Sequence, residues 1–192
     1  MTIEEKMSLL SEAQVLQTGH FRLTSGRHSD KYMQCARVFE DAKFSEPMCK
    51  DIAEAFKGQG ITLVVGPALG GVIISYEVAR QLGVRNIFAE RENGTMTLRR
   101  GFSINQGEKV LVVEDTITTG GSVKEVIELV TKNGGVVVGV GSVVDRSNGK
   151  VDFGVPLHAA VAMEVVSYEE DECPLCKAGL AITKPGSRTF NK

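Results

Sequence analysis

Hydrophobic positions along the chain follow two spacings, one typical of helices and one typical of strands. Apolar residues spaced three and four apart predict helices at residues 3–17 and 44–57, before the first strand. From residue 61 onward, short β-branched runs alternate with helical stretches. The predicted elements of this region, in chain order, are strand 61–66, helix 70–83, strands 86–91 and 109–115, helix 121–134, and strands 136–145 and 157–166.

The alternation of strands and helices predicts an α/β fold. Strands that are apolar on both sides, joined by helices of about 10–15 residues, form a mostly parallel sheet with helices on both faces. Residues 167–192 lack periodicity and predict an irregular cap which, with the N-terminal segment, would cover one end of the sheet. The 192 residues, 42% hydrophobic and 24% charged, fit a single domain.

The composition argues against several classes of protein. A formal net charge of −2 gives no reason to expect nucleic acid or an anionic membrane as a partner. No apolar run approaches the roughly 18 residues of a membrane span, and the acidic, helical start is unlike a signal peptide. Four cysteines are too few for a disulfide scaffold and predict reduced thiols. We therefore expect a cytoplasmic protein.

The segment Glu114–Ser122, with the sequence EDTITTGGS, carries the clearest chemistry. It follows a buried strand, and in open α/β sheets ligands bind outside the carboxyl ends of the strands. Its turn, residues 118–122, combines hydroxyl groups, glycines and the start of a helix, which together predict an anion site. The turn lacks the Walker spacing, which disfavours nucleotide triphosphate hydrolysis. Neither it nor GPALGG at residues 66–71 has the dinucleotide fingerprint of a Rossmann-type dehydrogenase.

The two carboxylates at the start of this segment are informative, because negative charge beside a phosphate is unfavourable unless another group separates the two. A sugar can do so. With a 5-phosphate on the turn, Glu114 and Asp115 would accept hydrogen bonds from the ribose 2- and 3-hydroxyls and favour positive charge at the anomeric carbon. The alternative is that the pair merely caps a helix. We favour the sugar because nine contiguous residues of this type follow the strand.

EDTITTGGS resembles the phosphoribosyl pyrophosphate motif of the type I phosphoribosyltransferases. Along nearly its whole length the chain is similar to one branch of them, the orotate phosphoribosyltransferases, in the segments HFRLTSGRHSD, GPALGG, AER, RRGF, VVDR and CPLC…KPGSR. The resemblance implies the type I fold and transfer of a phosphoribosyl group to N1 of orotate, with release of pyrophosphate, in pyrimidine (UMP) synthesis. It implies Mg²⁺ as the cofactor, carried by the substrate and without a protein ligand.

The resemblance also implies how the single domain, residues 1–192, is organised. A core at about residues 40–146 would carry a hood formed by about residues 1–39 and 147–192. A mobile lid at about residues 92–106 would close over the neighbouring active site of a homodimer. A lid matters because expelling water strengthens charge contacts and prevents hydrolysis of a reactive ribosyl cation.

Residue by residue, the resemblance assigns Asp115, Glu114 and Arg91 as catalytic. The residues implied to bind phosphoribosyl pyrophosphate are Glu114, Asp115, Thr116, Ile117, Thr118, Thr119, Gly120, Gly121, Ser122, Ala68, Leu69, Gly70 and Arg91. Those implied to bind orotate are Thr118, Arg146, Tyr32 and Met33. Arg146 can meet the orotate carboxylate with forked hydrogen bonds, or alternatively pair with Asp145 at the surface.

The chain departs from the family pattern in its basic residues. Many members carry a lysine in the turn where this chain has Gly70–Gly71, so backbone amides would have to bind the pyrophosphate; the alternative is a simple tight turn. A frequent lysine before SGR is replaced by Thr24, while Ser25–Arg27 remain expected neighbours of the site. The family's further lid lysines and histidine are absent. Arg99 and Arg100 would replace them or are simply solvated.

Cys173 and Cys176 have the spacing of a zinc knuckle, but a structural zinc site needs four ligands and the sequence has no second CxxC or CxxH. We expect ordinary reduced thiols, with a redox-sensitive pair or a shared metal as alternatives. His20, His28 and His158 lack a triad context and are expected to be surface or packed residues. Two other functions stay open: transfer to a purine or uracil, and sensing of the substrate by a regulator, for which no nucleic-acid-binding element is visible.

Overall fold

The computed structural model describes residues 1–23 and 25–185 of the chain. Its centre is a six-stranded sheet with the strand order β5-β4-β3-β6-β7-β8. Neighbouring strands are parallel except at β5, which adds an antiparallel edge. The strands are β3 (Leu63–Pro67), β4 (Arg85–Glu92), β5 (Thr95–Thr97), β6 (Lys109–Ile117), β7 (Val136–Asp145) and β8 (Leu157–Ala162). The predicted α/β class with a mostly parallel sheet is confirmed.

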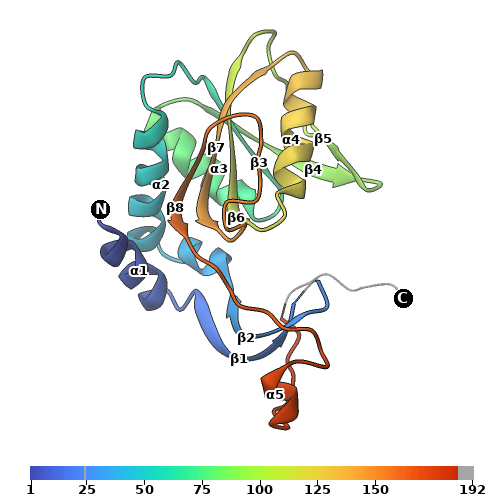
Figure 1. Ribbon diagram of the computed structural model, residues 1–192. Coiled ribbons are helices and arrows are strands. Elements are labelled where there is room, and N and C mark those ends of the chain that lie inside the picture. The colour runs from blue at the N-terminus through green and yellow to red at the C-terminus, as the bar shows by residue number, and fades with distance from the viewer. Residues whose placement is uncertain (24, 186–192) are drawn as a thin grey trace.

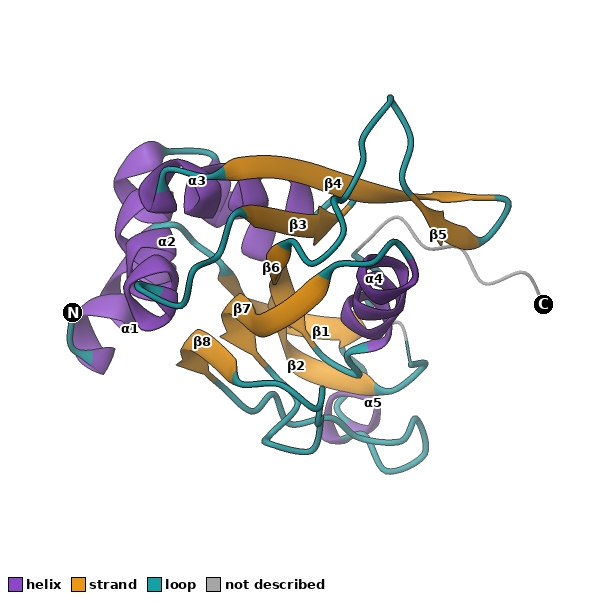
Figure 2. Ribbon diagram, turned by 90° about the horizontal axis from the view of Figure 1, so that it is seen from above, coloured by secondary structure: helices purple, strands orange, loops and turns teal. Residues whose placement is uncertain are grey.

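Helices cover both faces of the sheet (Figure 2). Two of them, α2 and α3, pack on one face, and α4 packs on the other. Successive residues of a strand point to opposite faces, so Val64 joins the hydrophobic cluster under α2 and α3, whereas Leu63 and Val65 join the cluster under α4. Burial on both sides explains why β3 is an uninterrupted apolar run. The helices are α2 (Ala42–Phe56), α3 (Gly71–Leu82) and α4 (Gly121–Lys132).

The N-terminal hairpin and the segment that follows β8 lie together on one side of this core and form a hood (Figure 1). An antiparallel hairpin of β1 and β2 is the centre of the hood. The C-terminal segment returns to this hairpin through backbone bridges between Phe21 and Thr183 and between His28 and Tyr168. Residues 186–192, which include the end of KPGSR, lie outside the described residues. The elements of the hood are α1 (Ile3–Glu12), β1 (Leu16–Arg22), β2 (His28–Met33), the 3-10 helix η1 (Cys35–Phe39) and α5 (Pro174–Lys177).

Element boundaries in the hood differ from the sequence prediction. The first helix ends at Glu12 rather than near residue 17, because the chain turns at Gln14, where φ is +52°. The β1-β2 hairpin is absent from the prediction, since burial along β1 does not alternate from residue to residue. The last strand, predicted to run to residue 166, ends at Ala162, which pairs with the last residue of β7. α5 is a single helical turn within the predicted irregular cap.

The expected lid begins as a hairpin at the edge of the sheet. β4 and β5 are joined by Asn93 and Gly94, whose φ angles are +50° and +83°. Two consecutive positive φ angles give the tight turn whose twist matches that of paired strands. β5 has only three residues, too few to show a period in the sequence. Residues 98–108 then connect to β6 without a helix or strand.

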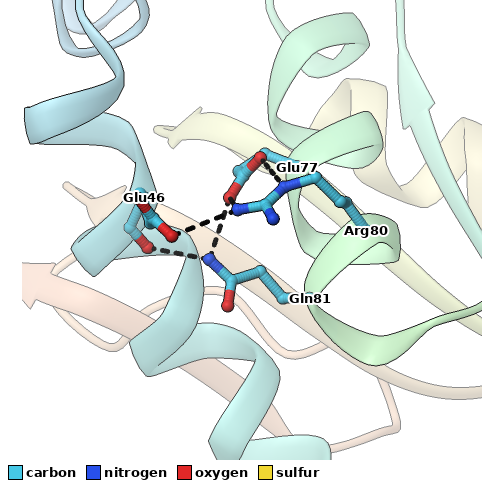
Figure 3. A network of polar contacts seen from close by, with 4 residues as sticks. All are labelled: Glu46, Glu77, Arg80 and Gln81. Carbon is cyan, nitrogen blue, oxygen red and sulfur yellow. Dashed lines mark hydrogen bonds and ion pairs between the residues drawn. The ribbon is translucent and has the colours of Figure 1, made fainter.

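Ion pairs hold α3 against α2 at the surface (Figure 3). Arg80 contacts Glu77, one turn earlier on α3, at 2.7 Å and Glu46 of α2 at 3.3 Å. Gln81 Nε2 donates to the Glu77 carboxylate at 2.8 Å and to the carbonyl oxygen of Glu46 at 3.2 Å. Exposed pairs of this kind add little stability each. They do orient α3, whose first residue follows directly on the turn after β3.

Asp51 of α2 joins three elements. Its carboxylate accepts from Nζ of Lys6 in α1 at 2.7 Å and from Nε2 of His158 in β8 at 2.9 Å. Burial alone would raise the pKa of Asp51, but the two partners outweigh burial and hold this pKa below its ordinary value. The contact docks the N-terminal helix onto the core, and it makes His158 a packed histidine.

Asp51→Asn should destabilise the protein by about 2 kcal/mol near neutral pH, the typical contribution of a hydrogen bond to a charged group. A carboxyl group whose pKa is lowered by folding stabilises the native state above its unfolded pKa of 3.8, and this stabilisation is lost as the pH falls through the native pKa. The difference in melting temperature from the unsubstituted protein should therefore be full well above pH 3.8 and shrink as the pH falls below 3.8. Glu54→Gln, in an exposed pair on the same helix, is the control. An equal loss in both variants would contradict the role of Asp51.

Candidate active site

A cleft of about 560 Å³ opens at the carboxyl ends of β3 and β6. The helix that follows β3 lies on one face of the sheet and the helix that follows β6 on the other, so the two connections diverge here. Open α/β sheets bind ligands at such a point, and the volume suits a small molecule. The cleft brings together three predicted groups of residues: all of Glu114–Ser122, Ala68–Gly70 and Arg91.

The turn between β6 and α4 presents backbone amides and hydroxyl groups to the cleft. Gly120 has a φ of +73°, and a Cβ at this position would lie 2.7 Å from Cγ1 of Val151. Backbone conformation and packing therefore both require glycine here. The first turn of α4 contains no acidic residue. The positive end of the helix dipole and the unpaired amides consequently favour an anion at this position.

Glu114 and Asp115 occupy the carboxyl end of β6 and both line the cleft. The Asp115 N–H donates to Oε1 of Glu114 at 3.3 Å. Burial raises the pKa of the Asp115 carboxyl above its ordinary value, although a side-chain hydrogen bond shared with Glu114 and hydrogen bonds from backbone N–H groups act in the opposite direction. Two carboxylates in a partly enclosed space favour a ligand that brings hydroxyl donors or positive charge.

The turn after β3 reaches the cleft through its backbone. The Ala68 N–H donates to the carbonyl oxygen of Ala89 at 2.7 Å, and the peptide bond between Ala68 and Leu69 is cis. A Cβ on Gly70 would lie 2.7 Å from Oδ1 of Asp115, closer than Cβ atoms approach other atoms. Glycine at position 70 therefore lets this backbone lie against the Asp115 carboxylate, which gives Gly70 a steric role in this chain.

Arg91 stands at the end of β4 on the wall of the cleft. Its guanidinium group pairs with Glu125 of α4 at 2.5 Å and donates to the carbonyl oxygen of Gly94 at 3.2 Å. Arg99 and Arg100, the other candidate lid cations, pair instead with carboxylates of β4, and neither lines the cleft. Of the three arginines considered for the lid, Arg91 is the one that lines the cleft in the described structure.

The residues expected to bind the base are only partly brought together. Tyr32 and Thr118 line the cleft. Arg146 does not line the cleft, but it lies close enough to Tyr32 for its positive charge to act on the Tyr32 hydroxyl. Burial raises the pKa of this hydroxyl, and the charge of Arg146 acts in the opposite direction. The buried Nε of Arg146 has no hydrogen-bond partner in the described structure. Met33 points away from Tyr32 into the core, where it is 6% exposed, because neighbouring strand residues alternate.

Two basic residues of the hood line the cleft although the sequence analysis assigns them no role. Arg22 ends β1, and Lys184 follows Thr183, whose carbonyl oxygen accepts from the Arg22 N–H at 2.9 Å. Both lie in segments that carry the family resemblance, so a search of those segments for cations would have found them. Glu125 of α4, the acidic partner of Arg91, also lines the cleft without a role predicted from the sequence.

The segment expected beside the site, Ser25–Arg27, is held by the C-terminal segment instead. Arg27 donates to the side chain of Ser167 at 2.9 Å and to its carbonyl oxygen at 2.7 Å, and it also pairs with Glu169. Thr24 lies outside the described residues. The role of this turn in the described structure is to connect the two ends of the chain.

Comparison with known proteins identifies the family. A family model described as a phosphoribosyl transferase domain matches residues 45–153. The chain is 56% identical to a protein named orotate phosphoribosyltransferase from Caldanaerobacter subterraneus subsp. tengcongensis, over 98% of this chain and 99% of that one. It is 59% identical, with the same coverage, to a protein of that name from Pelotomaculum thermopropionicum. The chain belongs to the orotate phosphoribosyltransferase family.

A solved structure of the orotate phosphoribosyltransferase family has the same fold. The crystal structure of the Mycobacterium tuberculosis orotate phosphoribosyltransferase in complex with inorganic phosphate is 25% identical, with a TM-score of 0.67 over 83% of this chain and 96% of that one. The family model covers the part of the cleft built by the sheet, whereas the hood residues lie outside residues 45–153. A search of residues 1–23 and 25–185 finds no helix with the length and hydropathy needed to cross a membrane.

Gly70→Ala should move the turn after β3 and the Asp115 carboxylate apart, at a cost of about 1–3 kcal/mol in the free energy of unfolding, as in other overpacked sites. If Asp115 is the obstacle, the same substitution should cost much less in an Asp115→Ala background, where the carboxylate is gone. Urea denaturation of the four proteins of this double-mutant cycle measures the coupling. Additive losses would show that the clash lies elsewhere.

Proposed function

We propose that this protein transfers the phosphoribosyl group of phosphoribosyl pyrophosphate to N1 of orotate, giving orotidine 5′-phosphate and pyrophosphate in de novo pyrimidine (UMP) synthesis. The observation that carries the proposal is the cleft itself. It gathers the whole of Glu114–Ser122, the turn after β3 and Arg91 in a chain that shares 56% of its residues with a protein named for this activity. Each part of the substrate has a counterpart in the cleft.

The turn at residues 118–122 suits the 5-phosphate. Its amides, its hydroxyl groups and the dipole of α4 all stabilise an anion, and no acidic residue opposes them in the first turn of the helix. The ribose then lies over the end of β6, where Glu114 and Asp115 can accept hydrogen bonds from its hydroxyl groups. The sugar thereby separates the carboxylates from the phosphate.

The carboxylates also suit the reaction. As the bond from the anomeric carbon to pyrophosphate breaks and the bond to N1 forms, positive charge grows on the ribose ring. Glu114 and Asp115 stabilise this charge more in the transition state than in the bound substrate, which is the condition for raising turnover. Because Asp115 is held in a partly buried position against Gly70, little reorganisation is needed when the charge appears.

The departing pyrophosphate needs donors and cations. Backbone amides of the turn after β3 supply donors, and the fold places Arg91, Arg22 and Lys184 on the same cleft. These three cations come from β4, β1 and the C-terminal segment. They compensate for the absence of the lysine that many family members carry in the turn after β3. Glu125 orients Arg91 toward the cleft wall through its 2.5 Å contact.

Arg146 supports orotate as the acceptor. Orotate is a flat ring that carries a carboxylate, and a guanidinium group can bind a carboxylate with two parallel hydrogen bonds. The buried Nε of Arg146, without a partner in the described structure and beside Tyr32, is a donor of this kind. Uracil and purines lack the carboxylate and would leave that donor unpaired.

Magnesium fits this site as a companion of the substrate. Mg²⁺ is usually held by one or two carboxylates together with substrate phosphates. Here the oxygens of the substrate would carry the ion, and Glu114 and Asp115 add negative charge on the same cleft without being direct ligands. When bound, the ion would neutralise charge on the leaving group. The protein's own part is to position the ribose and to bind the anions on either side of it.

The expected homodimer has support at the surface of α3. Ile73 and Tyr76 are 53% and 61% exposed, and Leu69 in the preceding turn is 88% exposed. Large apolar side chains gathered on one face are typical of an interface. A second copy on this face would stand beside the turn after β3, near enough for the expected lid, about residues 92–106, to act on a neighbouring site.

The four free cysteines suit the reducing cytoplasm.

The base is tested by mixing the protein, Mg²⁺ and phosphoribosyl pyrophosphate with orotate, uracil, hypoxanthine or adenine separately and following pyrophosphate release. Release with orotate alone is expected, because only orotate carries a carboxylate for Arg146. Release with another base would refute the acceptor. Binding of phosphoribosyl pyrophosphate without release for any base would favour the regulator over the enzyme.

Asp115→Asn should lower kcat by about 10²–10³-fold with a much smaller change in KM, the range seen when one transition-state partner is removed. Folding raises the pKa of this carboxyl, so its charge destabilises the native state above pH 3.8, and the penalty disappears below that pH. The variant should therefore melt at the same temperature as the original protein or higher at pH 7. Glu128→Gln, an exposed carboxylate on α4, is the control. Unchanged kcat in Asp115→Asn would sink the proposed role.

A further inference from the structure

Four potential metal ligands from the two ends of the chain meet inside the hood. His20 lies in β1 and His28 begins β2, while Cys173 precedes α5 and Cys176 lies within it. One ligand atom from each residue falls within 4.8 Å of all the others. The expectation of ordinary thiols rests on the lack of a second CxxC or CxxH in the sequence. A second motif is not required, since two histidines about 150 residues earlier complete the set.

Four of the six distances between these atoms lie near the edges of a tetrahedron around zinc, and all six are within 4.8 Å. His20 Nε2 lies 3.3 Å from His28 Nδ1, and His28 Nδ1 lies 3.2 Å from Cys176 Sγ. His20 Nε2 lies 3.6 Å and 3.7 Å from the sulfurs of Cys173 and Cys176. Bonds of about 2.0–2.1 Å from zinc to nitrogen and about 2.3 Å to sulfur give tetrahedral edges of about 3.3 Å between nitrogens and about 3.6 Å from nitrogen to sulfur. We propose that His20, His28, Cys173 and Cys176 bind a structural zinc ion.

The surroundings of His20 support a ligand role. Nδ1 of its ring donates to the carbonyl oxygen of Leu180 at 2.8 Å. This hydrogen bond places the ring proton on Nδ1 and leaves the lone pair of Nε2 directed at the other three ligand atoms. Metal-binding histidines are usually fixed in this way by a carbonyl or carboxylate on the second nitrogen. The carbonyl belongs to the same C-terminal segment that carries the two cysteines.

The ligand types select the metal. Two thiols and two imidazoles form the Cys₂His₂ set of structural zinc sites, and the Cys-x-x-Cys spacing is common in them. Mg²⁺ and Ca²⁺ prefer oxygen ligands, of which this cluster has none. A network of hydrogen bonds alone is a weaker account, because a thiol is a poor donor and two sulfurs approach the same nitrogen.

The C-terminal segment buries little apolar surface of its own, and its other contacts are backbone bridges and polar side-chain contacts with the hairpin. Neither hydrophobic cluster contains a described residue beyond Val165. α5 buries no side chain, and Leu180 and Ile182 are 54% and 46% exposed. Yet Cys173, His28 and His20 are 0%, 2% and 5% exposed, so three of the four ligand residues are buried where the segment meets the hairpin, whereas Cys176 is exposed. Short segments without a core are commonly stabilised by a metal, whose binding energy becomes folding energy.

The site also has a consequence for the cleft, which rests on the proposed function. Backbone hydrogen bonds join Thr183 to His20 and Arg22, at 2.8 Å and 2.9 Å. The next residue, Lys184, lines the cleft together with Arg22. Zinc bound between the hairpin and the C-terminal segment would hold both cations in place for the pyrophosphate. The zinc site itself stands on the four ligands and does not depend on the reaction.

Metal analysis of the full-length protein, purified without chelators, tests the site directly. One zinc ion per chain is expected. Cys176→Ser changes the most accessible ligand and should lose the zinc, whereas Cys49→Ala, which removes a thiol from the core under α2, should retain it. Exchange for Co²⁺ should give the intense visible absorption of a tetrahedral thiolate complex in the original protein and in Cys49→Ala, but not in Cys176→Ser.

Measurements on the unsubstituted protein keep the proposal testable if variants fold poorly. Removal of zinc by a chelator should lower the melting temperature and speed amide hydrogen exchange at residues 166–185, and added zinc should reverse both. Protein that contains no zinc and takes up no Co²⁺ overturns the site, as does a Cys173–Cys176 disulfide in freshly lysed cells. Zinc present without phosphoribosyl transfer to any base would refute the proposed function and leave the metal site standing.

Discussion

Burial of β6 on both faces determines where the polar chemistry of this protein is located. Val110 to Val113 are 0% exposed and contribute alternately to the clusters under α4 and under α2 and α3. A strand enclosed in this way cannot hold an unpaired charge along its length. The acidic pair therefore stands at its carboxyl end, beyond the last residues that pair with β3, where the connections of the two strands diverge. The same divergence brings the turn after β3 against Asp115, and Gly70 makes that approach sterically allowed.

The core and the hood contribute different charged groups to the cleft. The sheet supplies the fixed parts, namely the acidic pair and the turn that leads into α4. Arg91 reaches the cleft from β4 and is held by Glu125, while Arg22 and Lys184 come from the hood. A net charge of −2 provides no general attraction for a polyanionic substrate, so cations must be placed locally. The hood is thus part of the binding site as well as a cover.

The extent to which the sequence predicts this arrangement follows from how far apart the interacting residues lie. Apart from β5, the strands and helices of the core are visible because each is long enough to show an apolar run or a helical period, and Glu114–Ser122 is visible because its parts are contiguous. The hairpin of β1 and β2 escapes detection, since its burial is decided by a C-terminal segment that the local pattern cannot include. The prediction that Met33 contacts the base together with Tyr32 fails for a different reason. Neighbouring residues of a strand point to opposite faces, so Met33 points into the core. Arg22 and Lys184 meet only through the bridge at Thr183.

The hood explains why a metal is a sensible substitute for a core. One side of the hairpin must stay polar, since it faces a cleft for a highly charged substrate, and the C-terminal segment is short and mostly exposed. Apolar burial at about 25 cal/mol per Å² cannot stabilise a segment that has so little apolar surface to bury. Bonds from one metal ion to ligands in two strands and at one helical turn would stabilise the segment without a large buried apolar surface. They need only four side chains.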